Sequence, residues 1–330
     1  MAAGALSLKP NQAVVERKGR SPLGDAIQQL LKNKVAVVSL IFLVGMILTA
    51  FLAPVIAPHP YDGLSAKLTD EPPMTRADDG RLFLLGTDKL GRDVLSRTIY
   101  STRISLGVAF VASSVSLLIG IIYGLVSGYG SHTRDNIMMR VVDFLYGFPF
   151  IIFIILVQVV VKAYSAREST SGTVGIFGKL LEMDKASGGI LIMFVAIGLI
   201  SWLGMARITR GQTLSFKNKE FVEAAHAVGN RDRRIIWKHI LPNILGPCIV
   251  FETLGIPGYI LLESFLSFIG LGVNPPTPSW GIMISESVRS IRTAPWEVFV
   301  PSAALTLTVL AFNFLGDGLR DAFDPRLRGE

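Results

Sequence analysis

The sequence has a single cysteine, few charged residues and no nucleotide-binding motif. Cys248 is the only cysteine in 330 residues, so neither an intramolecular disulfide nor a cysteine-based metal site can form. Charged residues make up 17% of the chain, whereas a soluble globular protein carries about a quarter. No G-x-x-x-x-G-K-[ST] segment is present. The composition therefore argues against a soluble globular domain, and the chain is not expected to hydrolyse ATP.

Long apolar segments dominate what is present. Half of the residues are hydrophobic, and the mean hydropathy is +0.50. A membrane-spanning helix needs about 20 mostly apolar residues, and six segments meet this requirement. The predicted transmembrane helices are 35–57, 104–130, 137–161, 188–206, 244–270 and 298–316. The sequence thus predicts an all-α polytopic membrane protein, with the fifth helix broken or kinked near Gly255, Pro257 and Gly258.

Basic residues set the expected orientation. The net charge of +7 is distributed around the apolar segments and not over a basic face with aromatic platforms, which argues against nucleic-acid binding. Segments 1–34, 131–140, 207–243 and 317–330 carry 19 basic residues, against 13 in the alternate set. Because cytoplasmic loops are enriched in Lys and Arg, both termini are expected to be cytoplasmic.

The connecting segments follow from the same assignment. Residues 1–34 are predicted to be a cytoplasmic N-terminal segment and not a cleavable signal, because the apolar segment that follows them is long enough to span a bilayer. The predicted external segments are 58–103, 163–187 and 272–297, and the predicted cytoplasmic tail is 317–330.

The cytoplasmic loop 207–243 is too long and too basic to be a minimal link between two helices. Within it, residues 220–228 predict a short amphipathic helix, which Gly229 ends. Glu220 and Glu223 favour its N-terminal turn through the helix dipole. The residues at i, i+3, i+4 and i+7 that form its predicted docking face are Phe221, Ala224, Ala225 and Val228.

The physical pattern alone leaves the partner of this helix open. The pattern fits two interpretations equally well. The helix docks into the groove of a partner protein, or it packs against the protein's own helices or on anionic lipid. A second amphipathic stretch, 235–241, leads to Pro242, where the next span is expected to begin.

Several motifs give the chain a family resemblance. Glu223-Ala224-Ala225, then Gly229, then His239-Ile240-Leu241-Pro242-Asn243 closely resemble the E-A-A loop of permeases in binding-protein-dependent ABC importers. The segments 86–97, 275–281 and 312–325 resemble the segment before the second span, the external turn after the fifth span and the C-terminal end of the peptide and nickel permeases of that family. The likeness spans about residues 30–328 and is greatest to the second permease subunit of oligopeptide importers, although the 163–187 loop is longer than expected.

The resemblance implies a fold, a mechanism and a set of partners. It implies the type I ABC importer transmembrane architecture in a bacterial inner membrane, with import of peptides by alternating access. The implied partners are a homologous second permease, two ATPase subunits that bind ATP and Mg, and an external peptide-binding protein. No cofactor is expected on this chain. The implied ATPase-coupling residues are Glu220, Phe221, Glu223, Ala224, Ala225, Val228 and Gly229.

Alternatives remain for the solute and for the energy source. Related permeases carry nickel or glutathione, and a secondary transporter would need no ATPase. Such a transporter would be expected to carry charges in several spans, whereas the first, fourth and sixth predicted spans have none.

Two carboxylates lie within the fifth predicted span. Glu252 and Glu263 are candidates to line the substrate path, because an ionisable group at membrane depth usually faces a cavity, a partner or water. The alternative is an internal hydrogen bond or a boundary position.

Other polar and small residues have simpler interpretations. A structural turn held by Asp88, Arg92 and Asp93 explains the 86–93 segment better than a phosphate loop does. Arg140 and Asp143 are expected to mark a helix end or to pair. His226 and His239 lack the neighbours of a metal site. The Gly120, Gly124 and Gly128 series predicts close helix packing.

Overall fold

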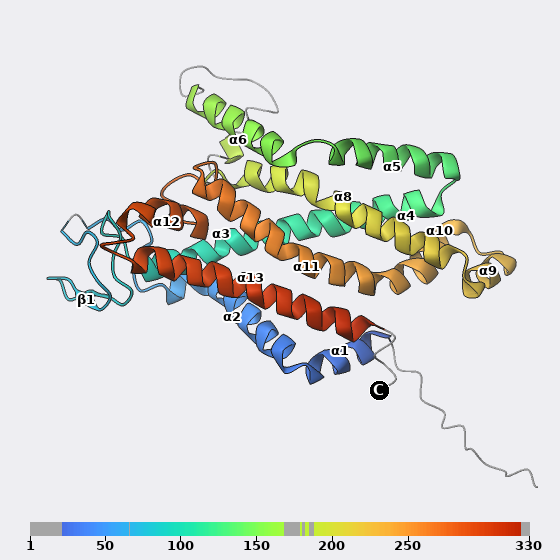
Figure 1. Cartoon of the computed structure of the whole chain (residues 1–330), viewed down its shortest axis with the longest axis horizontal. Helices are drawn as coiled ribbons and strands as arrows, with labels where there is room; N and C mark the ends of the chain where they lie inside the picture. Colours follow the sequence, from blue (N-terminus) through green and yellow to red (C-terminus); the bar gives the residue numbers. More distant parts are fainter. Residues whose placement is uncertain (1–21, 66, 168–178, 180–181, 185–187, 325–330) are drawn as a thin grey trace, which may run out of the picture.

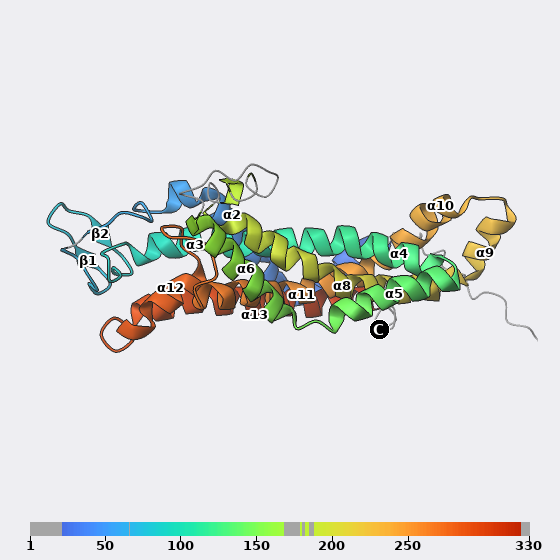
Figure 2. The same cartoon turned by 90° about the horizontal axis from the view of Figure 1, so that it is seen from above.

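The protein is an elongated bundle of helices, shown in Figures 1 and 2 as a computed structural model that describes residues 22–65, 67–167, 179, 182–184 and 188–324. Most of the 163–187 loop and the residues 1–21 and 325–330 lie outside the described residues. The long helices run along the bundle, and short elements gather at its two ends (Figure 1). The end that carries residues 220–235 is called here the α9 end, and the opposite one the α12 end.

The chain is helical almost throughout its described part. The helices are α1 (Pro22–Lys32), α2 (Lys34–Ile56), α3 (Val94–Val115), α4 (Ile121–Tyr129), α5 (His132–Tyr146), α6 (Phe150–Arg167), α8 (Ile190–Lys217), α9 (Glu220–Ala227), α10 (Asp232–Ile235), α11 (Leu241–Phe268), α12 (Trp280–Ser287) and α13 (Trp296–Phe323). Two π-helical turns, η1 (Ser116–Gly120) and η3 (Ile236–Ile240), and a 3-10 turn, η4 (Val288–Ser290), lie between them. The only strands among the described residues are β1 (Thr75–Arg76) and β2 (Leu82–Phe83), which pair antiparallel.

The prediction of an all-α membrane fold is confirmed. Five continuous helical segments are long and apolar enough to cross a membrane, and α5 with α6 makes a sixth if the two count as one span. The α5–α6 pair is bent by 70°, whereas the sequence predicted a single transmembrane helix over 137–161. Pro149 lies in the break, and proline disfavours the helical conformation of the residue before it.

The predicted break in the fifth helix is wrong, while the alternative prediction of a kink stays a prediction. α11 continues through Pro247 and Pro257, and together with α10 and η3 it forms one segment from Asp232 to Phe268. Pro257 is buried, because α11 packs against α3, α8, α12 and α13. Membrane helices tolerate proline where neighbouring helices surround it. The 232–241 stretch is continuous with this helix, and the start of the membrane span at Pro242 stays a prediction.

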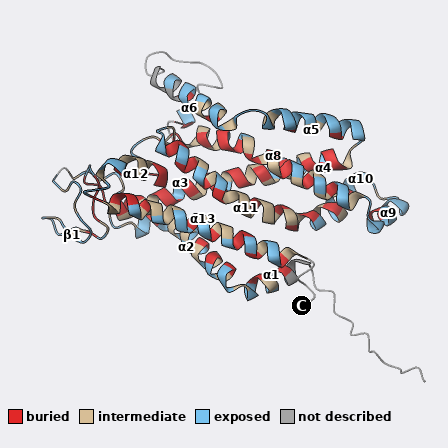
Figure 3. Cartoon of the chain, viewed as in Figure 1, coloured by how far each residue is buried: buried red, intermediate tan, exposed pale blue. Residues whose placement is uncertain are grey.

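Glycines bring α4 and its π turn against α8 without a gap, as the sequence predicted. A methyl group added at Gly120 would lie 2.5 Å from the side chain of Met205, and one at Gly124 would lie 2.5 Å from that of Thr209. Figure 3 shows that buried residues concentrate along α3, α8 and α11, whereas α5 and α6 are largely exposed. Small residues in the contact thus let two backbones approach closely.

One predicted pairing is replaced by another. Asp143 Oδ1 accepts a hydrogen bond from Arg207 on α8 at 2.7 Å, so its partner is not Arg140. Asp143 lies in the last turn of α5, which fits the other predicted role, that of marking a helix end.

A buried charge cluster holds the α12 end together, and the predicted turn at 88–93 is confirmed within it. Asp88 accepts hydrogen bonds from the backbone and Nε of Arg92, at 3.0 and 2.7 Å, and from Arg97. Glu286 on α12 accepts from Arg92 at 2.7 Å and from Arg97 at 3.1 Å. Asp93 caps α3 by accepting from the backbone of Ser96 at 2.8 Å. Two arginines thus join the 86–97 segment to α12.

Replacing Asp88 by alanine is expected to destabilise the protein strongly. The side chains of Arg92 and Arg97 are 5% and 2% exposed, so the change leaves buried charges with less compensation. Breaking such a cluster lowers the free energy of unfolding by about 3–5 kcal/mol. The midpoint of thermal unfolding of the purified transporter should therefore fall by about 10 °C.

Asp79→Ala is the matched control. Asp79 also pairs with an arginine, Arg81, at 2.6 Å, but both side chains are about half exposed. An exposed ion pair contributes about 0–1 kcal/mol to the free energy of unfolding, so the unfolding midpoint of Asp79→Ala should stay close to that of the wild type. Equal midpoints for the two variants would contradict a structural role for the cluster.

Candidate functional site

The short helix α9 projects from the bundle between α8 and α10 (Figure 1). Lys219 is extended, and Glu220 and Glu223 occupy the first turn of the helix. At the other end, Gly229 has φ +82°, a conformation that favours glycine. The backbone N–H of Asn230 donates to the carbonyl of Ala225 at 3.1 Å, which closes the helix as left-handed C-terminal caps do. The predicted start and stop signals therefore act as expected.

One face of α9 packs against the bundle, and the other face is exposed. Val222 is fully buried and Ala225 is 6% exposed, and both pack in a cluster with Leu125, Met205 and other residues of the bundle. The predicted docking face included Ala225, and this part of the prediction is wrong. The contact with the bundle follows an i, i+3 pair that starts at Val222, which the sequence pattern overlooked.

The other predicted coupling residues are all exposed. They are Glu220, Phe221, Glu223, Ala224, Val228 and Gly229. Phe221 is 41% exposed and lies against Phe216, with ring centroids 6.4 Å apart, and Val228 is 84% exposed. α9 thus presents two large apolar side chains and two carboxylates away from the bundle.

Tyr129, at the end of α4, fixes the position of α9. Its hydroxyl donates to Asp232 Oδ1 at 3.0 Å and lies 2.9 Å from His226 Nε2. Lys217 Nζ donates to the carbonyl oxygen of Tyr129 at 3.0 Å. One hydroxyl therefore contacts both α9 and α10. No local pattern in the sequence points to this residue, because its partners are 97 and 103 positions away.

A second polar contact reinforces the same end of the bundle. Arg210 on α8 donates from two nitrogens to the carboxylate of Asp135 on α5, at 2.6 and 2.5 Å. Ser127 on α4 donates to the same carboxylate at 2.5 Å. A bidentate Arg–carboxylate pair has a fixed geometry, so α4, α5 and α8 are held together directly beside α9.

The two carboxylates of α11 are buried inside the bundle. Glu263 is fully buried and accepts hydrogen bonds from Ser105 on α3 at 2.9 Å and from Ser267 at 2.7 Å. Glu252 is 4% exposed and accepts from Ser116 in η1 at 2.6 Å, while its Oε1 has no hydrogen-bond partner among the described residues. Both residues therefore join α11 to the α3–η1 segment, and their predicted place on a substrate path remains a prediction.

Metal ligation finds no support in the described part of the chain. No group of three or more His, Cys, Asp or Glu side chains there could hold a metal ion. His226 instead contacts Tyr129.

Comparison with known proteins gives a consistent family. Residues 102–329 match the binding-protein-dependent transport system inner membrane component family, and residues 21–76 match the N-terminal TM domain of oligopeptide transport permease C. The oligopeptide transport system permease protein OppC of Haemophilus influenzae is 43% identical over 95% of this chain and 92% of its own length.

Two further relatives differ in the solute that their names give. The dipeptide transport system permease protein DppC of Bacillus subtilis is 40% identical over 95% of this chain and 89% of its own length. The glutathione transport system permease protein GsiD of Pectobacterium atrosepticum is 36% identical over 95% of this chain and 94% of its own length.

The helical membrane fold, the exposed helix of the E-A-A loop and these matches over nearly the whole chain agree. The chain belongs to the binding-protein-dependent transport system inner membrane component family, the membrane permeases of ABC importers.

Proposed function

We propose that this permease carries peptides, foremost oligopeptides, into the bacterial cytoplasm by alternating access. It would form the pathway together with a homologous permease and receive its solute from an external binding protein. The names of the relatives support this assignment, since OppC and DppC proteins are oligopeptide and dipeptide permeases. The GsiD relative makes glutathione the second candidate. Measuring the affinity of the partner binding protein for oligopeptides and for glutathione separates the two solutes.

One observation carries the coupling role: apolar side chains are exposed on one side of α9, while its other side is packed against the bundle. Phe221 on α9 and Val228, the residue that follows the helix, are exposed, while Val222 packs the opposite face of α9 against the bundle. An aromatic side chain on a short helix suits a groove in a partner. We therefore assign α9 to a cleft in a partner ATPase, where its movement would follow nucleotide binding.

The arrangement of the two ends supports cytoplasmic termini. α1 and the end of α13 lie toward the α9 end, whereas β1, β2 and α12 lie at the opposite one (Figure 1). The α9 end includes the basic residues Arg231, Arg233, Arg234 and Lys238. Because Lys and Arg favour the cytoplasmic side, α9 would face the compartment that holds ATP.

Reversing one charge on α9, by Glu223→Lys, is expected to uncouple transport from ATP hydrolysis. Glu223 is exposed in the first turn, where a positive charge opposes the helix dipole and alters the docking surface. Peptide uptake in reconstituted vesicles should fall about tenfold relative to ATP hydrolysis, within the usual range of coupling energies. Gly229→Val should act similarly, because valine is strained at φ +82°.

Asp321→Lys is the matched control for the charge reversal. Asp321 is also exposed and lies near the end of α13, but outside α9. This control should insert in the membrane and transport peptide at the wild-type rate. Normal uptake by Glu223→Lys and Gly229→Val would contradict the coupling role of α9.

Removing the Tyr129 hydroxyl is expected to weaken coupling while leaving the fold intact. Tyr129→Phe keeps the ring but loses the contacts with His226 and Asp232. Variants along a coupling route change coupling by about 0.5–2 kcal/mol, so the uptake per ATP hydrolysed should fall about fivefold.

Tyr123→Phe is the control for this change. Tyr123 lies on the same helix, and its hydroxyl donates to the Met138 carbonyl at 2.8 Å without contacting α9. The ratio of uptake to hydrolysis should be normal in that variant. Thermal unfolding checks that the two proteins are equally stable. If both changes lower the ratio equally, the position of α9 does not depend on Tyr129.

A further inference from the structure

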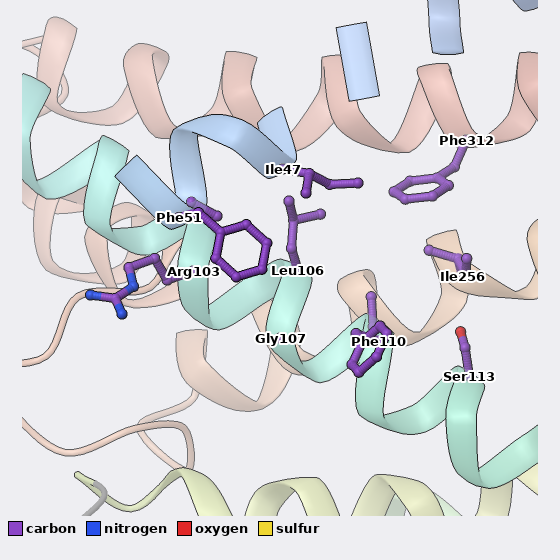
Figure 4. A pocket seen from close by; sticks show the side chains of 11 residues that line it. Ile47, Phe51, Arg103, Leu106, Gly107, Phe110, Ser113, Ile256 and Phe312 are labelled. Atoms are coloured by element: carbon purple, nitrogen blue, oxygen red, sulfur yellow. The ribbon is translucent and has the colours of Figure 1, made fainter. Parts of the chain in front are cut away.

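An apolar cavity opens in the flank of the bundle between α2, α3, α11 and α13. Its volume is about 550 Å³, within the range of about 300–1,000 Å³ for ligand pockets. The lining residues are Ile47, Ala50, Phe51, Arg103, Leu106, Gly107, Ala109, Phe110, Ser113, Ile256 and Phe312. Figure 4 shows Arg103 at one end of the cavity, with Ser113 and Phe312 toward the other.

Arg103 is the one charged side chain that lines the cavity. It is exposed, and no described side chain forms an ion pair or hydrogen bond with it. The neighbouring arginines Arg92 and Arg97 are, in contrast, buried in the cluster with Asp88. Arginines near the ends of membrane helices extend to the interface, where anionic lipid headgroups attract them.

The position of Arg103 along its helix coincides with a membrane boundary. The uncharged run of this span begins at the next residue, Ile104. The whole helical segment Val94–Tyr129 has 36 residues, so it is about 54 Å long, whereas the hydrocarbon core is about 30 Å thick. Part of it therefore projects beyond the hydrocarbon. Because Arg92, Arg97 and Arg103 precede the uncharged run, we assign its first turns to this projecting part and the Arg103 guanidinium to the level of the lipid headgroups.

The lining of the cavity suits a hydrocarbon chain and not a peptide. Besides Arg103, Ser113 offers the only polar side chain, and its hydroxyl has no hydrogen-bond partner among the described residues. Each unpaired backbone group of a peptide would cost several kcal/mol in such surroundings. An acyl chain carries no polar groups. Phe51 and Phe110 flank the cavity, and they are 77% and 75% exposed.

We infer that this cavity is a binding site for one membrane glycerophospholipid, with the phosphate on Arg103 and an acyl chain among Phe51, Phe110, Ile256 and Phe312. The bound chain would fill the space between α2 and the rest of the bundle. Since no described carboxylate forms an ion pair with Arg103, a headgroup with net negative charge, such as that of phosphatidylglycerol, should bind better than phosphatidylcholine. The inference does not depend on the solute or on the coupling role of α9.

Photo-crosslinking tests the site in the assembled transporter. The probe is phosphatidylglycerol with a diazirine on one acyl chain, included in the liposomes that hold the purified transporter. After irradiation, mass spectrometry of peptides should place the adducts on residues of the cavity, in particular Phe110 and Ile256. Arg103→Gln should lower this labelling about fivefold, the size of effect typical of one basic side chain at an anionic lipid surface. The same probe with a choline headgroup should label the wild type more weakly.

Two pairs of variants control the experiment. Arg289→Gln removes another exposed arginine that does not line the cavity, and it should leave the labelling unchanged. Ala50→Phe fills the cavity from the α2 side and should abolish the adducts, whereas Val38→Phe, at an exposed site of the same helix outside the cavity, should not.

The inference is overturned if Arg103→Gln and Arg289→Gln give the same labelling, or if no adduct falls on a residue of the cavity. It is also overturned if a photoreactive peptide substrate labels the cavity in place of the lipid, or if Phe110→Cys forms a disulfide with a cysteine of the second permease subunit.

Discussion

One helical segment, Val94–Tyr129, makes polar contacts at every level of the molecule. At the α12 end, Arg97 pairs with Asp88 and with Glu286 on α12. Within the bundle, Ser105 and Ser116 donate to Glu263 and Glu252 on α11. In an apolar medium, an unpaired carboxylate is costly, so these contacts restrict how α11 can lie against this segment. Apolar packing alone would allow several registers.

The same segment changes its hydrogen-bonding pattern at the level of Glu252. The π turn η1 begins at Ser116, which donates to Glu252, and it ends at Gly120, which packs on Met205 of α8. π turns are frequent at functional sites because the extra residue redirects the side chains around them. Here the start of the turn, at Ser116, contacts α11, and its end, at Gly120, packs closely against α8. The glycines then continue this contact down to Tyr129.

The sequence predicted what depends on local pattern and composition. The spans, the acidic first turn of α9 and its stop at Gly229 follow from residues that are near one another in the chain. The predicted break at Pro257 failed because proline lowers helix stability locally, whereas here the surrounding helices decide. The bend between α5 and α6 was missed because the two helices taken together are apolar enough to be interpreted as one span. Ala225 was assigned to the outer face because the pattern alone does not say which side of a short helix meets the bundle.

The most informative contacts lie beyond any local pattern. Tyr129 contacts α9 across 97 positions, and Arg97 contacts Glu286 across 189. Each joins an end of the Val94–Tyr129 segment to a short helix outside the bundle. Because a helix resists changes in length, a movement of α9 that Tyr129 follows must displace the whole segment or bend it at η1. A rigid displacement would reach α12 through Arg97, whereas bending at η1 would first change the contact of Glu252. The two short helices thus contact the same helical segment, one at each end, and Glu252 contacts that segment between them, at η1.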